Sequence, residues 1–280
     1  MKRFLPLLAV LSVVLAACGG YSETARSETS DGVKCPTGTP TALTILAASS
    51  LANAFNEAKE KFLVNQPCVS DITFSFGSSS TLATQIVNGS PADVFVAASQ
   101  TAMETVTTAG VNEGEPTVFS YNRGEIMISG KSDFVDSVFN VADMRDSANK
   151  GIRVGLCVSS APCGSIADKI IEKSRKISKA SDLVRAAFAD TEAASAEELV
   201  TKIEIGELDA GIVYHSDCFS SERKGLVQCR EIPLSLNATT EYAAVALKNS
   251  AGAQIFIRFL LSKEVQTLLN EKYGFYNYDQ

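Results

Sequence analysis

The sequence has 280 residues, 45% of them hydrophobic, which is enough for one large domain or two modest ones with a normal buried core. Its formal net charge is -7. A chain this acidic is a poor candidate for nucleic-acid binding, because such binding depends on cationic groups that neutralise phosphates.

The first 17 residues are typical of an export signal peptide. Lys2 and Arg3 give the charged start, and the apolar stretch that follows is too short to span a bilayer comfortably. The tetrapeptide LAAC, which ends at Cys18, looks like a bacterial lipobox and predicts lipid modification of that cysteine. A plain signal peptide with an incidental cysteine is the alternative. Cleavage before Cys18 removes two basic residues and no acids, so the net charge falls from -7 to -9.

Residues 18–40 are predicted to be a flexible tether between the lipid and the folded domain. The segment from Tyr21 to Pro40 is rich in Ser, Thr, Glu and Gly and contains few large apolar residues. The mature protein is therefore expected to be exported and lipid-anchored to the outer face of the cell membrane.

A strand, a pair of serines and a helix open the predicted domain. The apolar run Ala42 to Ala47 predicts a buried strand, and Ser49 and Ser50 follow it as candidate helix caps. Apolar residues then recur at helical spacing from Leu51 to Phe62, while charged residues lie off that stripe.

The same order of elements returns along the chain. The run from Ile72 to Phe76 leads into Ser78, Ser79 and Ser80, and a helix-like stretch from Thr81 to Asn88 follows. Further strands are expected at residues 92–99, 124–129, 151–157, 210–214 and 241–247, and further helices at residues 166–173, 196–205 and 253–275. Strands that alternate with helices predict an α/β fold with parallel sheets.

Six cysteines remain if Cys18 carries the lipid, and an even number in an exported chain predicts disulfides. Sequence alone does not choose among the possible pairings, but the spacing favours two local bridges and leaves a third pair. A zinc site is the weaker alternative, because the chain has no CxxC pair and His215 is its only histidine. The favoured pairs are Cys157–Cys163, Cys218–Cys229 and Cys35–Cys68.

Small or hydroxyl residues fill three of the loops between a strand end and a helix start. The first amides of a helix lack internal partners and the helix dipole adds partial positive charge, so such loops bind anions without Lys or Arg. In open α/β sheets, ligands lie at the carboxyl ends of the strands. Helix capping alone also accounts for these serines, and the sequence leaves both interpretations open.

Several of these segments together resemble the periplasmic molybdate-binding proteins of molybdate ABC transporters. The segments are AASSLANAF, FGSSSTLATQI, PADVFVAAS, GELDAGIVYHSD and EKYGF, and the resemblance covers about residues 42–276. It implies a two-lobed periplasmic-binding-protein fold of type II, or Venus-flytrap fold, with a ligand cleft between the lobes. Lobe 1 would comprise residues 41–121 and 236–280, and lobe 2 residues 122–235.

The resemblance also implies which residues hold the oxyanion. Ser50, Ser79 and Tyr214 would donate hydrogen bonds from their hydroxyls, and two backbone amides would complete the site. One amide belongs to the loop residue Cys163, where the family usually has alanine, and the other lies close to Ala196. Asp93 is expected to brace a turn, because a carboxylate near a dianion repels it.

The implied function is capture of molybdate or tungstate and its delivery to the membrane permease of an ABC transporter. Such a protein is expected to be a monomer that needs no cofactor and catalyses no reaction. A binding protein for another tetrahedral oxyanion, such as sulfate, is the nearest alternative.

Two alternatives belong to other classes. An exported hydrolase lacks support, because the chain has no G-x-S-x-G motif and the cysteines that could pair with His215 are assigned to disulfides. A purely structural surface lipoprotein would bind no small ligand. Tyr214, for its part, fits equally well as a half-buried packing residue at the end of a strand.

Overall fold

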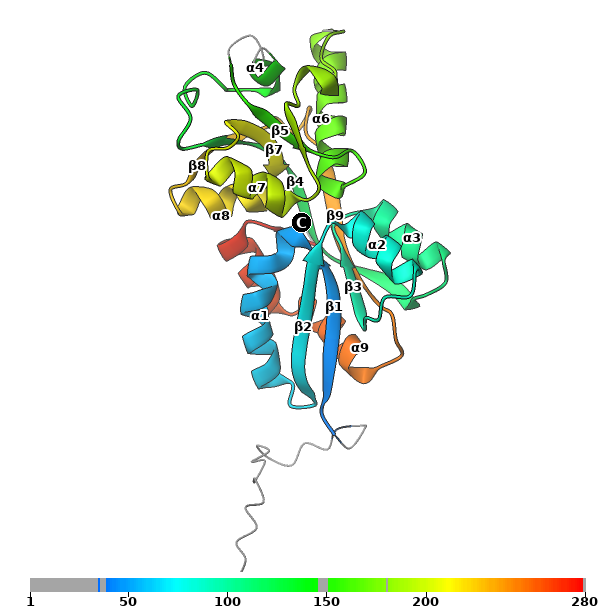
Figure 1. Ribbon diagram of the computed structural model, residues 1–280. Coiled ribbons are helices and arrows are strands. Elements are labelled where there is room, and N and C mark those ends of the chain that lie inside the picture. Colours follow the sequence, from blue (N-terminus) through cyan, green and yellow to red (C-terminus); the bar gives the residue numbers. More distant parts are fainter. Residues whose placement is uncertain (1–34, 36–38, 146–150, 180, 279–280) are drawn as a thin grey trace, which may run out of the picture. The chain divides into compact units, whose positions relative to one another are not determined.

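The computed structural model describes residue 35 and residues 39–145, 151–179 and 181–278. The predicted signal peptide, Cys18 and most of the predicted tether lie outside these residues. Residues 34–280 form one unit, and Figure 1 shows the two lobes of this unit. No helix in the described ranges is both long and apolar enough to cross a membrane.

The first lobe is built from two separate parts of the chain. The amino-terminal part contains β1 (Thr41–Ala48), the 3-10 turn η1 (Ser49–Leu51), α1 (Ala52–Asn65), β2 (Val69–Gly77), α2 (Ser79–Val87), β3 (Val94–Ala97) and α3 (Gln100–Thr108). The carboxyl-terminal part contains β9 (Thr239–Ala246), α9 (Ala251–Leu260), α10 (Lys263–Thr267), the π-helical turn η3 (Leu268–Lys272) and β10 (Tyr276–Asn277).

The second lobe comes from the middle of the chain. Its elements are α4 (Val141–Arg145), β5 (Val154–Cys157), α6 (Pro162–Ser178), the 3-10 turn η2 (Arg185–Ala187), β6 (Thr191–Ala193), α7 (Ala196–Glu204), β7 (Ala210–Tyr214), α8 (His215–Arg223) and β8 (Val227–Glu231). The exact residues at which the chain passes between the lobes, expected near Tyr121 and Ser235, stay a prediction.

One long strand, β4 (Glu113–Ser129), takes part in both lobes. Its first part pairs with β9, and its last part, from Gly124 onward, pairs with β7 and β8. The strand order through the described chain is β2-β1-β3-β9-β4-β7-β5-β6, with β8 and β10 also pairing with β4.

The sheet is mixed: the predicted parallel pairing is present in both lobes, but antiparallel pairs join it. β1 runs parallel to β2 and β3, and β5 runs parallel to β6 and β7. By contrast, β9 is antiparallel to both β3 and β4. The reason is that β4 leads the chain out of the first lobe and β9 leads it back in the opposite direction.

Alternating side chains place helices on both faces of the first lobe's sheet. Leu43, Ile45 and Ala47 of β1 pack into a core with α1 and α9, whereas Leu46 packs on the other face with α2 and α3. This alternation follows from the two-residue period of a strand. The second lobe has one apolar core of its own, formed mainly by β4, β5, β7, α6 and α7.

The described part of the chain contains three disulfides, and they are the pairs that the spacing favoured: Cys35–Cys68, Cys157–Cys163 and Cys218–Cys229. Cys35 belongs to the predicted tether, and its bridge to Cys68 attaches it to the loop before β2. The backbone amide of Thr41 also donates to the carbonyl of Cys68, at 3.1 Å. The predicted tether is therefore attached to the folded domain at Cys35.

Two predicted helices differ from the observed ones. The helix expected at residues 166–173 begins four residues earlier, at Pro162, whose fixed φ suits the first turn of a helix. The long run at residues 253–275 is broken into α9, α10 and η3. Ser262 begins a new helix there, because its hydroxyl accepts a hydrogen bond from the amide of Val265 at 3.3 Å.

The first testable prediction concerns Asp93, which braces β1 and β9. Its carboxylate accepts the backbone amide of Thr44 at 2.7 Å and pairs with Lys248 at 2.9 Å. Replacing Asp93 with alanine leaves that amide without its acceptor, which should lower the free energy of unfolding by about 1–3 kcal/mol. Urea denaturation measures this loss.

Asp93→Asn keeps an oxygen acceptor for the amide and should lose less stability than Asp93→Ala. The control is Asp71→Ala, which removes an exposed carboxylate of the same lobe and should change stability little. An equal loss in the Asp93→Ala and Asp71→Ala variants would contradict this role.

Candidate functional site

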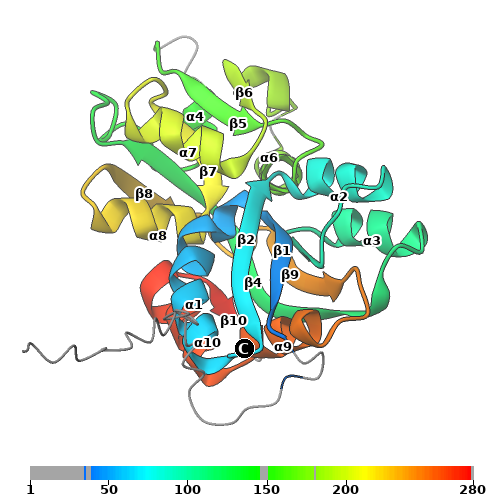
Figure 2. The same ribbon diagram turned by 60° about the horizontal axis from the view of Figure 1, so that its bottom comes forward.

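A small cavity lies where the two lobes meet. In Figures 1 and 2 the carboxyl ends of β1 and β2 point toward the lobe that carries α6 and α7. The cavity is lined by residues that follow β1, β2 and β3 in the first lobe and by residues at the starts of α6 and α7 and the end of β7 in the second. They are Ala48, Ser49, Ser50, Gly77, Ser78, Ser79, Ala98, Pro162, Cys163, Ser195, Ala196 and Tyr214.

All five residues that the sequence singled out as ligands line this one cavity. Ser50 and Ser79 come from the first lobe, and Cys163, Ala196 and Tyr214 come from the second. The structure therefore brings together residues that lie as much as 164 positions apart in the chain. Their role as ligands stays a prediction.

The cavity is small and its lining is electrically neutral. Its volume is about 10 Å³, close to the space that one water molecule needs. No lining residue carries a charged side chain. Such a cavity suits a compact ion or molecule and excludes an organic solute as large as a sugar, unless the lobes part.

Ser79 is buried at the start of α2, with its hydroxyl already used as an acceptor. The backbone amide of Ala98, which follows β3, donates to the Ser79 Oγ at 3.0 Å. The hydroxyl proton of Ser79 is left to donate elsewhere, and the side chain borders the cavity. The neighbouring strand end thus prepares this hydroxyl to act as a donor.

Ser50 is held by a tyrosine that the sequence analysis did not identify. The Oγ of Ser50 lies 2.9 Å from the hydroxyl of Tyr242 on β9, and Asn122 on β4 donates to that same hydroxyl at 3.5 Å. Asn122 also donates to Ser216, at the start of α8, at 2.7 Å. If Tyr242 donates to Ser50, the proton of Ser50 is free to point into the cavity.

The expectation that Ser49 and Ser50 cap a helix was wrong. Neither side chain makes a capping hydrogen bond, and both residues belong to the 3-10 turn η1 that precedes α1. The tighter turn lets the Ser50 hydroxyl reach Tyr242 instead of a helix amide. Tyr242 itself stands in a run that the sequence marked only as a strand, so no local signal pointed to it.

Tyr214 ends β7 and is fully buried, and its hydroxyl is the one tyrosine oxygen of the cavity lining. Burial raises the pKa of this phenol well above its usual value, so it stays protonated and can donate. The hydroxyl has no hydrogen-bond partner among the described residues. A buried hydroxyl without a partner is costly, and this one borders a cavity in which an acceptor would satisfy it.

Backbone amides complete the second lobe's side of the cavity. In α6 the first intrahelical bond runs from the amide of Ser165 to the carbonyl of Ala161. The Cys163 amide lies two residues before Ser165, ahead of this first bond. In α7 the hydroxyl of Ser195 accepts the amide of Glu198 at 3.2 Å, and Ala196 lies between them. Both amides thus lie in first turns, where a helix has donors to spare.

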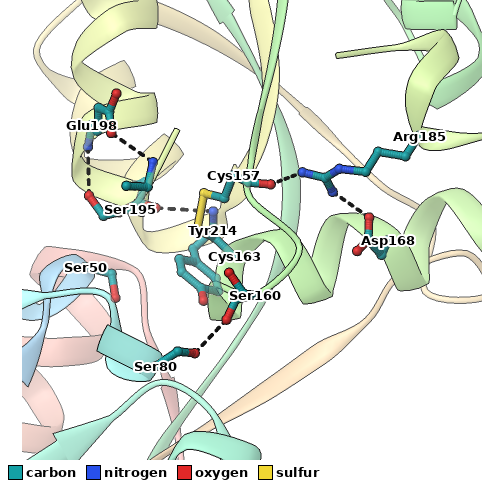
Figure 3. The surroundings of a disulfide bond; sticks show 12 residues. Ser50, Ser80, Cys157, Ser160, Cys163, Asp168, Arg185, Ser195, Glu198 and Tyr214 are labelled. Carbon is teal, nitrogen blue, oxygen red and sulfur yellow. Dashed lines mark hydrogen bonds and ion pairs between the residues drawn. A yellow bond between two sulfur atoms is a disulfide. The ribbon is translucent and has the colours of Figure 1, made fainter. Parts of the chain in front are cut away.

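The start of α7 agrees with the helix predicted from about Ala196. Ser195-Ala-Glu-Glu198 has the spacing of a capping box, but the Glu198 carboxylate accepts the amide of Ala194 at 2.8 Å and not that of the N-cap residue Ser195. Figure 3 shows the hydrogen bond between Ser195 and Glu198 beside Tyr214 and the Cys157–Cys163 disulfide. The Ser195 cap fixes the helix start at Ala196.

His215, the residue after Tyr214, does not line the cavity. Its Nδ1 lies 2.6 Å from the Glu125 carboxylate, and its ring stacks on Tyr276 with centroids 5.3 Å apart. The cavity lining contains no carboxylate or imidazole that could serve as a general base. What the lining offers is a set of neutral donors, which can hold a small anion.

Comparisons with known proteins agree with this geometry. Residues 43–276 match the family described as bacterial extracellular solute-binding protein. The molybdate-binding protein ModA of Mycobacterium tuberculosis is 30% identical over 252 residues, which cover 90% of this chain and 88% of that protein.

Two solved structures share the fold. The sulfate-binding protein SubI of Mycobacterium tuberculosis has a TM-score of 0.73 at 17% identity, with 85% of this chain and 88% of that chain covered. The periplasmic molybdate-binding protein of Azotobacter vinelandii has a TM-score of 0.69 at 19% identity, with 83% and 98% covered. The predicted two-lobed α/β fold class is confirmed.

The second prediction follows from the unpartnered hydroxyl of Tyr214. Removing it in Tyr214→Phe should leave the free energy of unfolding of the anion-free protein unchanged or higher, because a buried unsatisfied group is lost. The same variant should gain less stability than the wild type when a tetrahedral oxyanion is added. Thermal unfolding with and without the anion measures both effects.

Tyr242→Phe is the matched comparison, since its hydroxyl already has a partner in Ser50. That variant should lose stability even without the anion. If Tyr214→Phe destabilises the anion-free protein as much as Tyr242→Phe does, the Tyr214 hydroxyl has another role.

Proposed function

The chain belongs to the bacterial extracellular solute-binding proteins, and we propose that it captures molybdate or tungstate and delivers it to the membrane permease of an ABC transporter. The proposal includes a mature protein anchored to the membrane through a lipid on Cys18. It also includes direct hydrogen bonds to the oxyanion from Ser50, Ser79 and Tyr214 and from the amides of Cys163 and Ala196.

The observation that carries the proposal is a buried cavity whose polar groups are neutral donors from both lobes. Molybdate at neutral pH has no proton to donate, so a site made of donors satisfies it fully. Protonated phosphate also needs an acceptor, and such a site discriminates against it. Entry of an ion of this size requires the lobes to part slightly and close again.

Sulfate is the second candidate, because the same donor chemistry serves any fully ionised tetrahedral oxyanion. The fold neighbour SubI is named as a sulfate-binding protein, which keeps this candidate open. Sulfate is the smaller ion, so its oxygens should not reach the donors of both lobes at once. We therefore expect the site to prefer molybdate and tungstate.

The third prediction tests the proposed ligands. A hydrogen bond to a charged acceptor is worth about 1.5–3 kcal/mol, so Ser79→Ala should weaken molybdate binding roughly ten- to a hundred-fold. Ser50→Ala should do the same. Calorimetric titration of each variant with molybdate, tungstate and sulfate gives the dissociation constants.

Ser75→Ala is the control, because Ser75 is an exposed serine on the adjacent strand β2. Ser78, the residue before Ser79, is a poorer control, because it also lines the cavity. Equal affinity for sulfate and molybdate would favour the sulfate function. Unchanged affinity in Ser79→Ala would mean that the anion binds elsewhere.

The fourth prediction concerns pH and Asp217, a half-buried residue of α8 beside the cavity. Desolvation, together with the negative charge of the nearby Glu204, raises the pKa of this carboxyl to about 7. The carboxylate accepts the backbone amide of Tyr214 at 3.3 Å. It lines an adjoining cavity of about 180 Å³, together with Ser50, Glu204 and Lys224 among others.

Asp217 is neutral below a pH of about 7 and negative above it, and a negative charge at this place repels a bound anion. Affinity for molybdate should therefore fall as the pH rises from about 6 to 8, by roughly three- to tenfold. Asp217→Asn should bind with nearly constant affinity over the same range. A wild-type affinity that does not change with pH would contradict the effect of Asp217.

A further inference from the structure

We propose that the loop closed by the Cys157–Cys163 disulfide couples anion binding to closure of the lobes, with Ser80 as its contact on the first lobe. One side of this loop borders the anion cavity, and another part of it forms a hydrogen bond across the cleft. The disulfide and Ser80 together would then determine how slowly the bound anion leaves. The inference rests on the proposed function.

The disulfide loop contacts the first lobe across the cleft through a short hydrogen bond. The hydroxyl of Ser80, in the first turn of α2, donates to the backbone carbonyl of Ser160 at 2.6 Å. Ser80 directly follows Ser79, which borders the cavity, and Ser160 lies within the disulfide loop. Figure 3 shows this bond beneath Tyr214 and close to the disulfide. It joins the two lobes directly, so it can exist only when they are close together.

Several interactions hold the loop in one shape. The disulfide closes it over a sequence separation of 6 residues. Inside it, the amide of Ala161 donates to the carbonyl of Val158 at 2.9 Å. A Cβ on Gly164 would lie 2.0 Å from that same carbonyl oxygen, so only glycine fits where the loop enters α6. A loop with so little freedom presents its amides and carbonyls in fixed relative positions.

The loop is also attached to its surroundings in the second lobe. The guanidinium of Arg185 donates to the carbonyl of Cys157 and pairs with Asp168 at 2.5 Å and Glu192 at 2.8 Å. The amide of Val158 donates to the carbonyl of Ala193 at 2.8 Å. Ala193 is followed closely by the cavity-lining start of α7. The hydrogen bond from Val158 to Ala193 thus joins the two segments of the second lobe that carry the Cys163 and Ala196 amides.

These contacts give the loop two connected tasks. The Cys163 end borders the anion, while the Ser160 carbonyl holds the first lobe. Because the disulfide fixes one relative to the other, an anion seated on the Cys163 amide keeps the carbonyl in place for Ser80. Without the disulfide, the carbonyl would move independently of the amide, and the bond to Ser80 would no longer favour the anion-bound state.

The test is the rate at which molybdate dissociates, measured by rapid mixing with excess tungstate as competitor. A neutral hydrogen bond contributes about 0.5–1.5 kcal/mol, so Ser80→Ala should raise the dissociation rate roughly three- to tenfold and leave the association rate nearly unchanged. Ser80→Thr keeps the hydroxyl and should restore the slow rate. If a cysteine variant fails to fold, the comparison of Ser80→Ala with Ser80→Thr still tests the Ser80–Ser160 hydrogen bond by itself.

The double variant Cys157→Ala/Cys163→Ala tests the coupling itself. It should raise the dissociation rate at least as much as Ser80→Ala, and adding Ser80→Ala to it should cause little further increase, because coupled residues are not additive. The matched control is Cys218→Ala/Cys229→Ala, which removes a disulfide away from the cavity lining and should lower stability without changing the dissociation rate.

Three results would overturn the inference: an unchanged rate in Ser80→Ala, fully additive effects of Ser80→Ala and the cysteine pair, or an equal acceleration in the control disulfide variant. A wild-type protein that binds no tetrahedral oxyanion would refute the proposed function and this inference with it. Wild-type binding together with any of the first three results would refute the inference alone.

Discussion

The proposed site has to hold a negative ion inside an acidic protein, and its lining has no cationic side chain. The proposal therefore replaces charge pairing with neutral hydrogen-bond donors. The donors are backbone amides in first turns of helices and hydroxyls at strand ends, and both gather at the carboxyl edge of a sheet. The remaining features of the site follow from the need to keep every proton directed inward.

When another group donates to a hydroxyl oxygen, the hydroxyl proton is left to act as a donor. For Ser79 the Ala98 amide does this, and for Ser50 the Tyr242 hydroxyl can do so. Tyr242 is in turn approached by Asn122, which lies on the strand shared by both lobes. The orientation of the Ser50 hydroxyl thus depends on a chain of buried polar groups that reaches the start of α8.

The sequence was sufficient to predict features that depend on the local order of residues, such as a strand that leads through serines into a helix. Strand, hydroxyl residues and helix start occur in that order around Ser79, as predicted. The five ligand residues, which only the family resemblance implied, line one cavity. Tyr242, Asn122 and the Ser80–Ser160 contact were not predicted, because they join residues 80 to 192 positions apart and depend on side-chain direction. The mixed sheet was also missed, since strand direction depends on where a connection returns and not on the strand itself.

The place of β9 in the sheet has a consequence for the order in which the molecule is assembled. β9 lies between β3 and β4 in the first lobe, yet it is separated from β3 in the chain by the whole second lobe. A chain that emerges from its amino-terminal end can complete the core of the second lobe from consecutive residues first. The first lobe must wait for β9, and its exposed strand edges depend on a long loop closure that slows folding. The first lobe, whose residues emerge first, is therefore the lobe that completes its folding last.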